Sequence, residues 1–409
     1  MKFTVDAKHL ARVLKNVKRA MDARTKHPML CNCIITTHTY DNGGSYIQIG
    51  AFSDKTTDYF QSNIDAYNVE NGIGIVAPVK RLLEIVSKMS GEITFNSKNI
   101  TETAAGKLSI EHQHGKTSLD TLPTADFPTP PLRTKEKANF ILSYKAFIEL
   151  YDKTAYGTSK DVARIALAGV KIEFASGKFD AVATDGHRMV MATNVKPIEG
   201  NGKIEAIIPL NAYKKLYALA KAIKPEELKF EYYNDDAIGQ HMVVRFVSKY
   251  FESFSIKLIG EAFPNWKDVI PKDNRSHWTI ETEALKAALE SVIPAADPFT
   301  HMVKLDIVKG NMALSTHDYD LALTANSSVE IKNCELYKEY SYAEIDNLKI
   351  GFNSIYLMEI LKQTRFADIT FSISEALRAC LLTGTPDDDY SAFTNSVILM
   401  QLYWPDDDS

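Results

Sequence analysis

The sequence predicts an α+β fold in which one unit, two helices packed on a β-sheet, is repeated three times. Three observations carry this prediction. An aromatic strand that leads into an amphipathic helix recurs at residues 3, 140 and 278, a second helix follows in each unit, and alternating β-rich segments lie between the helices. The aromatic residues are 137 and then 138 positions apart, so we expect three equivalent domains.

The first helix of each unit follows directly on the strand that carries the aromatic residue. Phe3, Phe140 and Trp278 each stand seven residues before the first apolar anchor of that helix. Further apolar residues recur three and four positions apart, which is the period of one helical face. The anchors are Leu10, Val13, Leu14 and Val17; Phe147, Leu150 and Tyr151; and Leu285, Ala288, Leu289 and Val292. Helices are therefore expected over residues 6–21, 143–156 and 282–293.

The second helix of each unit begins after Pro78, after Pro209 and after Phe352-Asn353. The same apolar spacing places these helices over residues 79–89, 211–222 and 354–365. Alternation of apolar and polar residues predicts strands at 46–49, 169–174, 228–233, 302–307 and 396–402.

Two proline-bearing breaks, at residues 126–131 and 263–266, fall where the period predicts domain joints. The expected domains are 1–128, 136–262 and 276–409. Three equivalent domains favour a quasi-symmetric assembly, although a tandem array without a ring fits the repetition equally well.

Length and composition describe an ordinary globular protein. At roughly 150 residues per domain, 409 residues correspond to about three domains. No apolar run approaches the roughly 20 residues that span a bilayer, and residues 1–5 enter a strand pattern without a signal sequence, so we expect a cytoplasmic protein without a membrane partner. Four scattered cysteines do not make a disulfide framework, and Cys31 and Cys33 alone fall short of a zinc site. We expect buried, reduced thiols and neither metal nor cofactor.

The charges are distributed unevenly over the chain, whose net charge is −5. The six expected helices carry 16 basic and 7 acidic residues, whereas the rest of the chain carries 31 basic and 45 acidic residues. Cationic helices on an anionic body suit a phosphate backbone held without base readout. Amphipathic helices that merely expose lysines to solvent remain an alternative.

Residues 183–189 contain the one segment that resembles enzyme chemistry. Asp185, His187 and Arg188 form a set that is able to act as an acid, a base or a phosphate-binding group. Asp185-Gly186 is also an ordinary hairpin turn signal. No second carboxylate cluster, glycine-rich phosphate loop, HExxH or GxSxG motif accompanies it, so we expect no catalytic residues and no enzyme.

Over essentially its whole length the chain resembles the bacterial-type β sliding clamps, the processivity factors of DNA polymerase III. The motifs that carry the resemblance are MKFTV at 1–5, RTKHPML at 24–30, LPTADFP at 122–128, RxxLxG at 164–169, TDGHR at 184–188, FP at 263–264 with VIP at 269–271, and FNxxYL at 352–357. Their common order and spacing make the likeness specific. The resemblance implies a head-to-tail homodimer that closes into a six-domain ring, with the helices lining a hole filled by double-stranded DNA. It further implies that the ring tethers the replicative polymerase, the clamp loader and other replication and repair proteins through short peptide motifs.

The resemblance also implies a peptide cleft between the second and third domains, in which apolar side chains accept a Leu or Phe of the partner and His187 and Arg188 shape the rim. The implied cleft residues are Leu167, Thr184, Gly186, His187, Arg188 and Met189, then Pro264 and Val269 of the linker, then Val397, Leu399 and Met400 of the last strand. For Leu167 and Val397, an ordinary place in the core is the alternative.

For DNA we expect weak contacts shared among several cations, and for ring closure a contact between the first domain of one subunit and the third domain of the other. The expected DNA contacts are Arg24, Lys80, Lys214, Lys215 and Lys221. The resemblance places Thr117 and Leu119 against Ile293, Pro294 and Ala295 in the dimer interface.

Some residues depart from the family pattern. Asp268 replaces a basic residue that is common in relatives, so less acidic peptides are expected to bind. Thr117 and Pro294 are less apolar than their usual counterparts, so a weaker dimer is expected. The aromatic and acidic tail at 404–409 is hypothesised to fold over the cleft. A monomeric DNA-binding or scaffold protein that kept the fold but not the ring is the remaining alternative.

Overall fold

The structure is a computed structural model of the 409-residue chain. It describes all residues except 23–24, 54–57, 99, 129–134, 162, 236–238, 273, 275, 309, 319, 337–348, 374–378, 387–393 and 403–409. The DNA contact expected at Arg24 and the tail hypothesis for residues 404–409 therefore lie outside the described residues.

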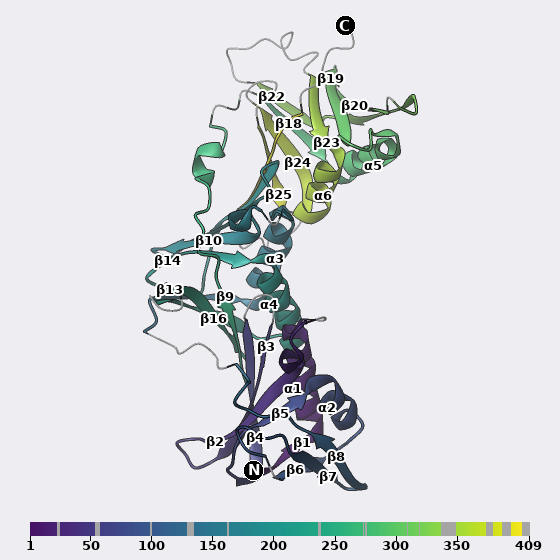
Figure 1. Ribbon diagram of the computed structural model, residues 1–409. Helices are drawn as coiled ribbons and strands as arrows, with labels where there is room; N and C mark the ends of the chain where they lie inside the picture. Colours follow the sequence, from purple (N-terminus) through teal and green to yellow (C-terminus); the bar gives the residue numbers. More distant parts are fainter. Residues whose placement is uncertain are drawn as a thin grey trace. The chain divides into compact units, whose positions relative to one another are not determined.

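Three repeats of two helices on antiparallel sheets are present, which confirms the predicted fold class (Figure 1). Each expected helix is found within a few residues of its predicted bounds. The helices are α1 Ala7–Ala20, α2 Val79–Val86, α3 Tyr144–Thr154, α4 Leu210–Ile223, α5 Thr282–Val292 and α6 Ser354–Thr364. Short 3-10 turns are η1 Pro28–Cys31, η2 Ala155–Gly157, η3 Ile165–Leu167, η4 Trp266–Val269 and η5 Ile293–Ala295. The exact domain bounds stay a prediction.

Among the described residues, each repeat has one strand before the first helix, four or five strands between the helices, and three strands after the second helix, the last of which we name the closing strand. In the first repeat these are β1 Lys2–Asp6, β2 Asn32–Thr39, β3 Ser45–Phe52, β4 Tyr59–Glu70, β5 Ile75–Pro78, β6 Glu92–Lys98, β7 Lys107–His112 and β8 Gly115–Asp120. In the second they are β9 Ala138–Ser143, β10 Gly169–Ala175, β11 Lys178–Thr184, β12 Arg188–Val195, β13 Glu199–Asn201, β14 Lys203–Pro209, β15 Glu227–Asp235, β16 Gly239–Val247 and β17 Phe251–Lys257. In the third they are β18 Ser276–Glu281, β19 Met302–Val308, β20 Asn311–Asp318, β21 Leu323–Glu330, β22 Asn333–Leu336, β23 Lys349–Asn353, β24 Phe366–Ile373, β25 Cys380–Pro386 and β26 Thr394–Leu399.

The aromatic residues that set the period are core residues. Phe3, Phe140 and Trp278 are fully or almost fully buried. Phe3 stacks on Phe95 with ring centroids 4.8 Å apart, and Phe140 stacks on Phe230 at 4.6 Å. Because each ring lies on the strand directly before a helix, it fixes the packing of that helix on its sheet.

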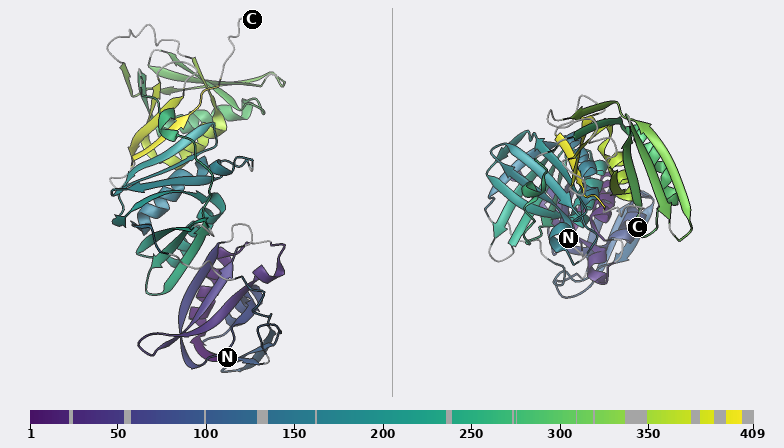
Figure 2. Two further views of the ribbon diagram at one scale, coloured as in Figure 1. Left: turned by 60° about the vertical axis from the view of Figure 1, so that its left-hand side comes forward. Right: turned by 90° about the horizontal axis from the view of Figure 1, so that it is seen from above.

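The chain forms two compact units. Unit 1 comprises residues 1–148, 174–177 and 197–260, and unit 2 comprises 149–173, 178–196 and 261–409. The strand order in unit 1 is β13-β9-β15-β16-β17-β4-β1-β6-β7-β8, with β3, β2 and β5 continuing from β4. In unit 2 one sheet has the order β10-β11-β12-β26-β25-β24-β18-β22, and a second has the order β21-β20-β19-β23. Helix α5 packs on α6 and against both of these sheets (Figure 2).

Repeats are joined by strand pairing within each unit. In unit 1 the closing strand β17 of the second repeat pairs with β4 of the first, with Phe254 opposite Phe60. In unit 2 the closing strand β26 of the third repeat pairs with β12 of the second, with Val397 opposite Val190. The two junctions use strands at corresponding positions of the repeats. Neighbouring repeats are therefore connected in the same way at both junctions.

Helix α1 is tied to the second repeat by a buried carboxylate. Both oxygens of Glu252, which is 1% exposed, lie 3.2 Å from Nη1 of Arg12 on α1, and Asn16 donates to the same group. The Arg12 guanidinium lies 4.0 Å above the ring of Tyr250, against which His9 also packs. Burial, aided by the Arg12 charge, lowers the pKa of His9 to about 4.

Two of the four thiols are buried. Cys33 and Cys380 lie in the core, and burial raises the pKa of the Cys33 thiol to about 12. Cys31 is exposed because it lies at the end of the surface turn η1, and Cys334 is half-buried, so the expectation of burial was wrong for these two residues. Across the described ranges, no helix is long and apolar enough to cross a membrane, and no group of three His, Cys, Asp or Glu side chains is placed to bind a metal ion.

The low pKa of His9 predicts an acid-sensitive junction between α1 and β17. The folded pKa lies below the ordinary value of 6.5, so His9 contributes stability that is fully present above pH 6.5 and is lost as the pH falls to about 4. Between pH 7.5 and 5, the melting temperature of the wild type should fall more steeply than that of His9→Gln. The exposed His114→Gln serves as the control and should follow the wild type; parallel curves for all three proteins would contradict the assignment.

Candidate functional site

The TDGHR motif forms the turn between β11 and β12, and its residues are fixed by hydrogen bonds within the turn. Oδ1 of Asp185 accepts from the backbone N–H of His187 and of Arg188, both at 3.0 Å. The Thr184 hydroxyl donates to the Arg188 carbonyl at 2.7 Å and accepts from Gly186 N–H. Gly186 has φ +92°, and a Cβ atom there would lie 2.8 Å from Nη1 of Arg164. The turn therefore requires glycine at this position.

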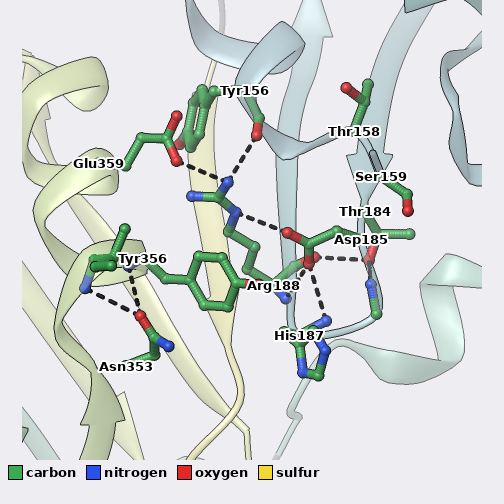
Figure 3. A network of polar contacts seen from close by, with 12 residues as sticks. Tyr156, Thr158, Ser159, Thr184, Asp185, His187, Arg188, Asn353, Tyr356 and Glu359 are labelled. Carbon is green, nitrogen blue, oxygen red and sulfur yellow. Dashed lines mark hydrogen bonds and ion pairs between the residues drawn. The ribbon is translucent and has the colours of Figure 1, made fainter. Parts of the chain in front are cut away.

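Arg188 is the centre of a buried network that joins the second and third repeats (Figure 3). It is 5% exposed, and its guanidinium contacts Asp185 at 3.2 Å, Glu359 on α6 at 2.9 Å and the carbonyl of Tyr156 at 2.9 Å. The ring of Tyr356, also on α6, lies 4.6 Å from the guanidinium carbon. A buried cation held by two carboxylates and a carbonyl is a rigid structural connection.

The tyrosines of this network remain neutral. Burial raises the pKa of Tyr156, and burial together with the Asp185 carboxylate raises the pKa of Tyr356. The ring of His187 stacks on Tyr356 at 5.9 Å. Asp185 and Arg188 are paired with one another instead of facing an open cavity, so the arrangement offers neither an activated nucleophile nor a free acid and base pair.

A second connection between the same repeats lies at the end of α6. The buried Lys153 side chain of α3 donates to the carbonyl of Thr364, in the last turn of α6. Next to it, Arg365 lies 3.7 Å from Asp152. A cation at this end of a helix is favoured by the helix dipole. Together with the Arg188 network it fixes α6 against the second repeat.

An open pocket of about 360 Å³ lies beside this junction, and we name it the Leu167–Pro264 pocket. Its volume lies in the range of roughly 300–1,000 Å³ typical of small-ligand sites. Its lining residues are Ala163, Arg164, Ile165, Ala166, Leu167, Glu261, Ala262 and Pro264. Most of these side chains are apolar, and Ile165 is 54% exposed. Such a pocket accepts an apolar side chain.

The linker after the pocket is anchored on the sheet of unit 2. Trp266 is buried among Val182, Met189, Met191 and Ile398, and its indole N–H donates to Glu173 at 3.1 Å. Lys267 contacts the other oxygen of Glu173 at 2.8 Å. Partial burial alone would raise the pKa of Glu173, but the hydrogen bonds from Lys267 and Trp266 hold it below its ordinary value.

The structure divides the expected cleft residues into accessible and buried ones. Leu167 and Pro264 line the pocket, and Val269 and Met400 are 49% and 42% exposed. Thr184, Gly186 and His187 lie in the exposed or half-exposed turn, next to the last strand through a bond from Met400 N–H to the His187 carbonyl at 3.0 Å. The buried ones are Arg188, Met189, Val397 and Leu399. The assignment of these residues to a peptide cleft stays a prediction.

Sequence reasoning missed several residues of this region. Arg164, Ile165 and Glu261 line the pocket, and Tyr156 and Glu359 complete the Arg188 network. For Glu359 a signal existed, because it stands three positions after Tyr356 on the same helical face. A signal also existed for Arg164 and Ile165, which stand beside Leu167 in the RxxLxG motif. Tyr156 and Glu261 are far in the sequence from the residues that they join and carry no local pattern.

The expected DNA and interface residues lie on different elements. Lys80, Lys214 and Lys221 are exposed on α2 and α4. Lys215 instead pairs with Asp22 at 2.8 Å, with its side chain 12% exposed, and it also donates to Ser53. Thr117 and Leu119 lie half-exposed on β8. Ile293, Pro294 and Ala295 form η5, in which Ala295 is buried.

Known proteins resemble the chain over most of its length. Residues 141–265 match the family model for the central domain of the DNA polymerase III beta subunit, and residues 267–397 match the model for its C-terminal domain. The beta sliding clamp of Pseudomonas aeruginosa is 22% identical over 389 residues, which cover 95% of this chain and 97% of that protein. The beta sliding clamp of Vibrio cholerae is 25% identical, covering 95% and 97%.

Solved structures show the same fold. The P. aeruginosa DNA polymerase III subunit beta has a TM-score of 0.80 at 20% identity, covering 99% of this chain and all of that one. The beta subunit from Thermotoga maritima has a TM-score of 0.77 at 19% identity, with the same coverage.

The Arg188 network predicts a large loss of stability on its removal. Arg188→Ala leaves Asp185 and Glu359 without their cation, which should cost about 3 kcal/mol, at the lower end of the range for broken buried pairs because Glu359 is 40% exposed. Unfolding in urea, followed by tryptophan fluorescence because Trp266 and Trp278 lie in unit 2, measures the loss. Arg164→Ala, at a side chain 54% exposed, should cost under about 1 kcal/mol. Equal losses in the two variants would show that Arg188 is not the connection described.

Proposed function

Because the chain belongs to the DNA polymerase III β subunit family, whose curated relatives are named β sliding clamps, we propose that two copies form a ring around duplex DNA. The ring holds DNA without reading its sequence and tethers the replicative polymerase for processive synthesis. In this role the protein carries out no chemistry of its own.

The proposal rests on the pairing of strands that are equivalent in the three repeats: two closing strands have found a partner strand in the preceding repeat. Closing strand β17 pairs with β4, and closing strand β26 pairs with β12. The remaining closing strand is β8, and β21 is the equivalent of β4 and β12 in the third repeat. Each of these two strands stands at one end of the strand order of its sheet. Within the described part of the chain, the outer edge of each has no strand partner. A second copy supplies β21 for β8 and β8 for β21, so two identical contacts close a ring.

Apolar residues at both edges support this contact. Leu119 lies half-exposed on β8. Leu323, 44% exposed, is the first residue of β21, and Leu321, 73% exposed, precedes this strand. The turn η5, with Ile293 and Pro294 at its surface, packs beside β21. Exposed apolar groups next to an unpaired strand edge are typical of a surface that is covered in an assembly.

Exposed cations on the helices of unit 1 support a DNA-binding role. They include Lys8, Lys15, Lys18, Arg19, Lys80, Arg81, Lys214 and Lys221. The carboxylates on these helices are already engaged, since Asp6 caps α1 and Glu84 pairs with Arg81. We expect Lys80, Lys214 and Lys221 to contact the phosphate backbone. Lys215 contributes mainly to the junction with Asp22.

The Leu167–Pro264 pocket is the proposed docking site for short segments of the polymerase and the clamp loader. Its apolar walls fit a Leu or Phe anchor. Val269 and Met400 are exposed apolar side chains that we expect the same segment to contact. Val397 and Leu399 are fully buried core residues.

Ring closure predicts a stable dimer. Light scattering across a dilution series should give about 92 kDa, twice the chain mass of 45.8 kDa. Leu119→Glu and Ile293→Glu should each shift the mass towards 45.8 kDa, because each places a carboxylate in the contact. Ile198→Glu, at an exposed site outside both edges, should remain a dimer. A persistent monomer in the wild type would favour a scaffold protein without a ring.

Topological binding predicts that DNA retention depends on a closed circle. Protein loaded on nicked circular DNA should be released when the circle is cut, which gel filtration of the complex detects. Joint replacement of Lys80, Lys214 and Lys221 by alanine should weaken DNA binding. It should also lower the salt slope by about 0.9 for each phosphate that the protein no longer neutralises.

The matched control removes three exposed lysines on strands: Lys178, Lys203 and Lys257. It should leave the salt slope unchanged. Equal weakening in the control would show that the helices do not form the DNA-binding surface.

A further inference from the structure

The Leu167–Pro264 pocket combines apolar walls with a charged rim. Ile165, Leu167, Ala262 and Pro264 supply most of the wall, and the two charged lining residues are Arg164 and Glu261. Apolar walls hold an anchor side chain, but many sequences supply such an anchor. The charges at the rim therefore decide which flanking residues are accepted beside it.

The cations at this rim are already neutralised within unit 2. Arg164 lies 3.6 Å from Asp161 and also contacts the Asp185 carbonyl at 3.4 Å. Lys267, on η4 beside the pocket, contacts Glu173 at 2.8 Å. Arg188 is held by two carboxylates and is 5% exposed. Each of these cations would have to lose an internal partner before it could bind an acidic residue of a partner protein.

Near the pocket, the exposed carboxylates of Glu261 and Asp268 have no cation partner among the residues that the structure describes. Glu261 lines the pocket itself. Asp268, on η4, accepts a hydrogen bond at 2.5 Å from Asn265, the residue that follows the lining residue Pro264. Lys160 and Lys272 flank these segments in the sequence, and neither side chain lines the pocket. The rim is thus net negative.

We propose that this pocket selects partner segments in which an apolar anchor is flanked by Lys or Arg, with Glu261 and Asp268 as the residues that set this preference. The inference rests on the proposed role of the pocket as a docking site. Both carboxylates are exposed, so their attraction acts on association and is screened by salt. A basic flank gains two new pairs without breaking an existing one, whereas an acidic flank meets only repulsion.

The test uses the full-length protein and three fluorescein-labelled peptides that share a Leu-Phe anchor and differ only in their four flanking residues: lysine, serine or glutamate. Fluorescence anisotropy at 50 mM salt should give the order lysine, serine, glutamate, with roughly threefold to tenfold between the extremes. At 500 mM salt the three affinities should converge. The double variant Glu261→Gln, Asp268→Asn should bind the three peptides with equal affinity.

The control Glu102→Gln removes an exposed carboxylate in unit 1 and should keep the full preference. Equal binding of the three peptides to the wild type, or a preference that survives the double variant, would overturn the charge proposal. Leu167→Asp separates this result from failure of the site itself. If the wild type binds no peptide, or if Leu167→Asp binds the peptides as well as the wild type does, the pocket is not the docking site and both proposals fail. If the wild type binds the three peptides equally and Leu167→Asp abolishes this binding, only the charge proposal fails.

Discussion

Backbone pairing between a closing strand and the preceding repeat is the constraint on which the rest of the structure depends. The β17–β4 and β26–β12 ladders join neighbouring repeats directly through the backbone. Because backbone groups supply these bonds, the junction tolerates wide sequence divergence, in keeping with a shared fold at 20% identity. Among the described residues, the same rule leaves β8 and β21 as the equivalents of these strands that pair on one edge alone, and an open edge is a site for assembly.

Side-chain networks then fix the angle at each junction. At the first, Glu252 is satisfied by Arg12 and Asn16 of α1, and Lys215 pairs with Asp22. At the second, Arg188 connects the β11–β12 turn to α6 through Asp185 and Glu359. Removing one partner from such a buried group leaves the other unpaired, which is more costly than losing a surface pair. The second network also orders Asp185, whose carbonyl accepts a hydrogen bond from Arg164 of the Leu167–Pro264 pocket.

The placement of these groups changes how the TDGHR segment is understood. Its Asp, His and Arg resemble catalytic residues in the sequence, yet in the structure Asp185 shapes a turn and Arg188 connects two repeats. Arg188 was expected at the rim of a cleft and is 5% exposed; Met189 was expected in the cleft wall and packs under Trp266. Neither position has a local signal, because the partners lie on α6 and in the linker.

The sequence by itself determined the six helices, the three aromatic core positions and the period of the repeat. Those features depend on residues close together in the chain, where helical spacing and strand alternation leave a direct trace. Only the tertiary structure decided which charges are free. Lys215 looked equivalent to Lys214 and became the partner of Asp22, while Glu261 kept an exposed carboxylate at the pocket. Charge pairing between distant segments depends on where the sheets bring them together, and a linear pattern carries no record of that.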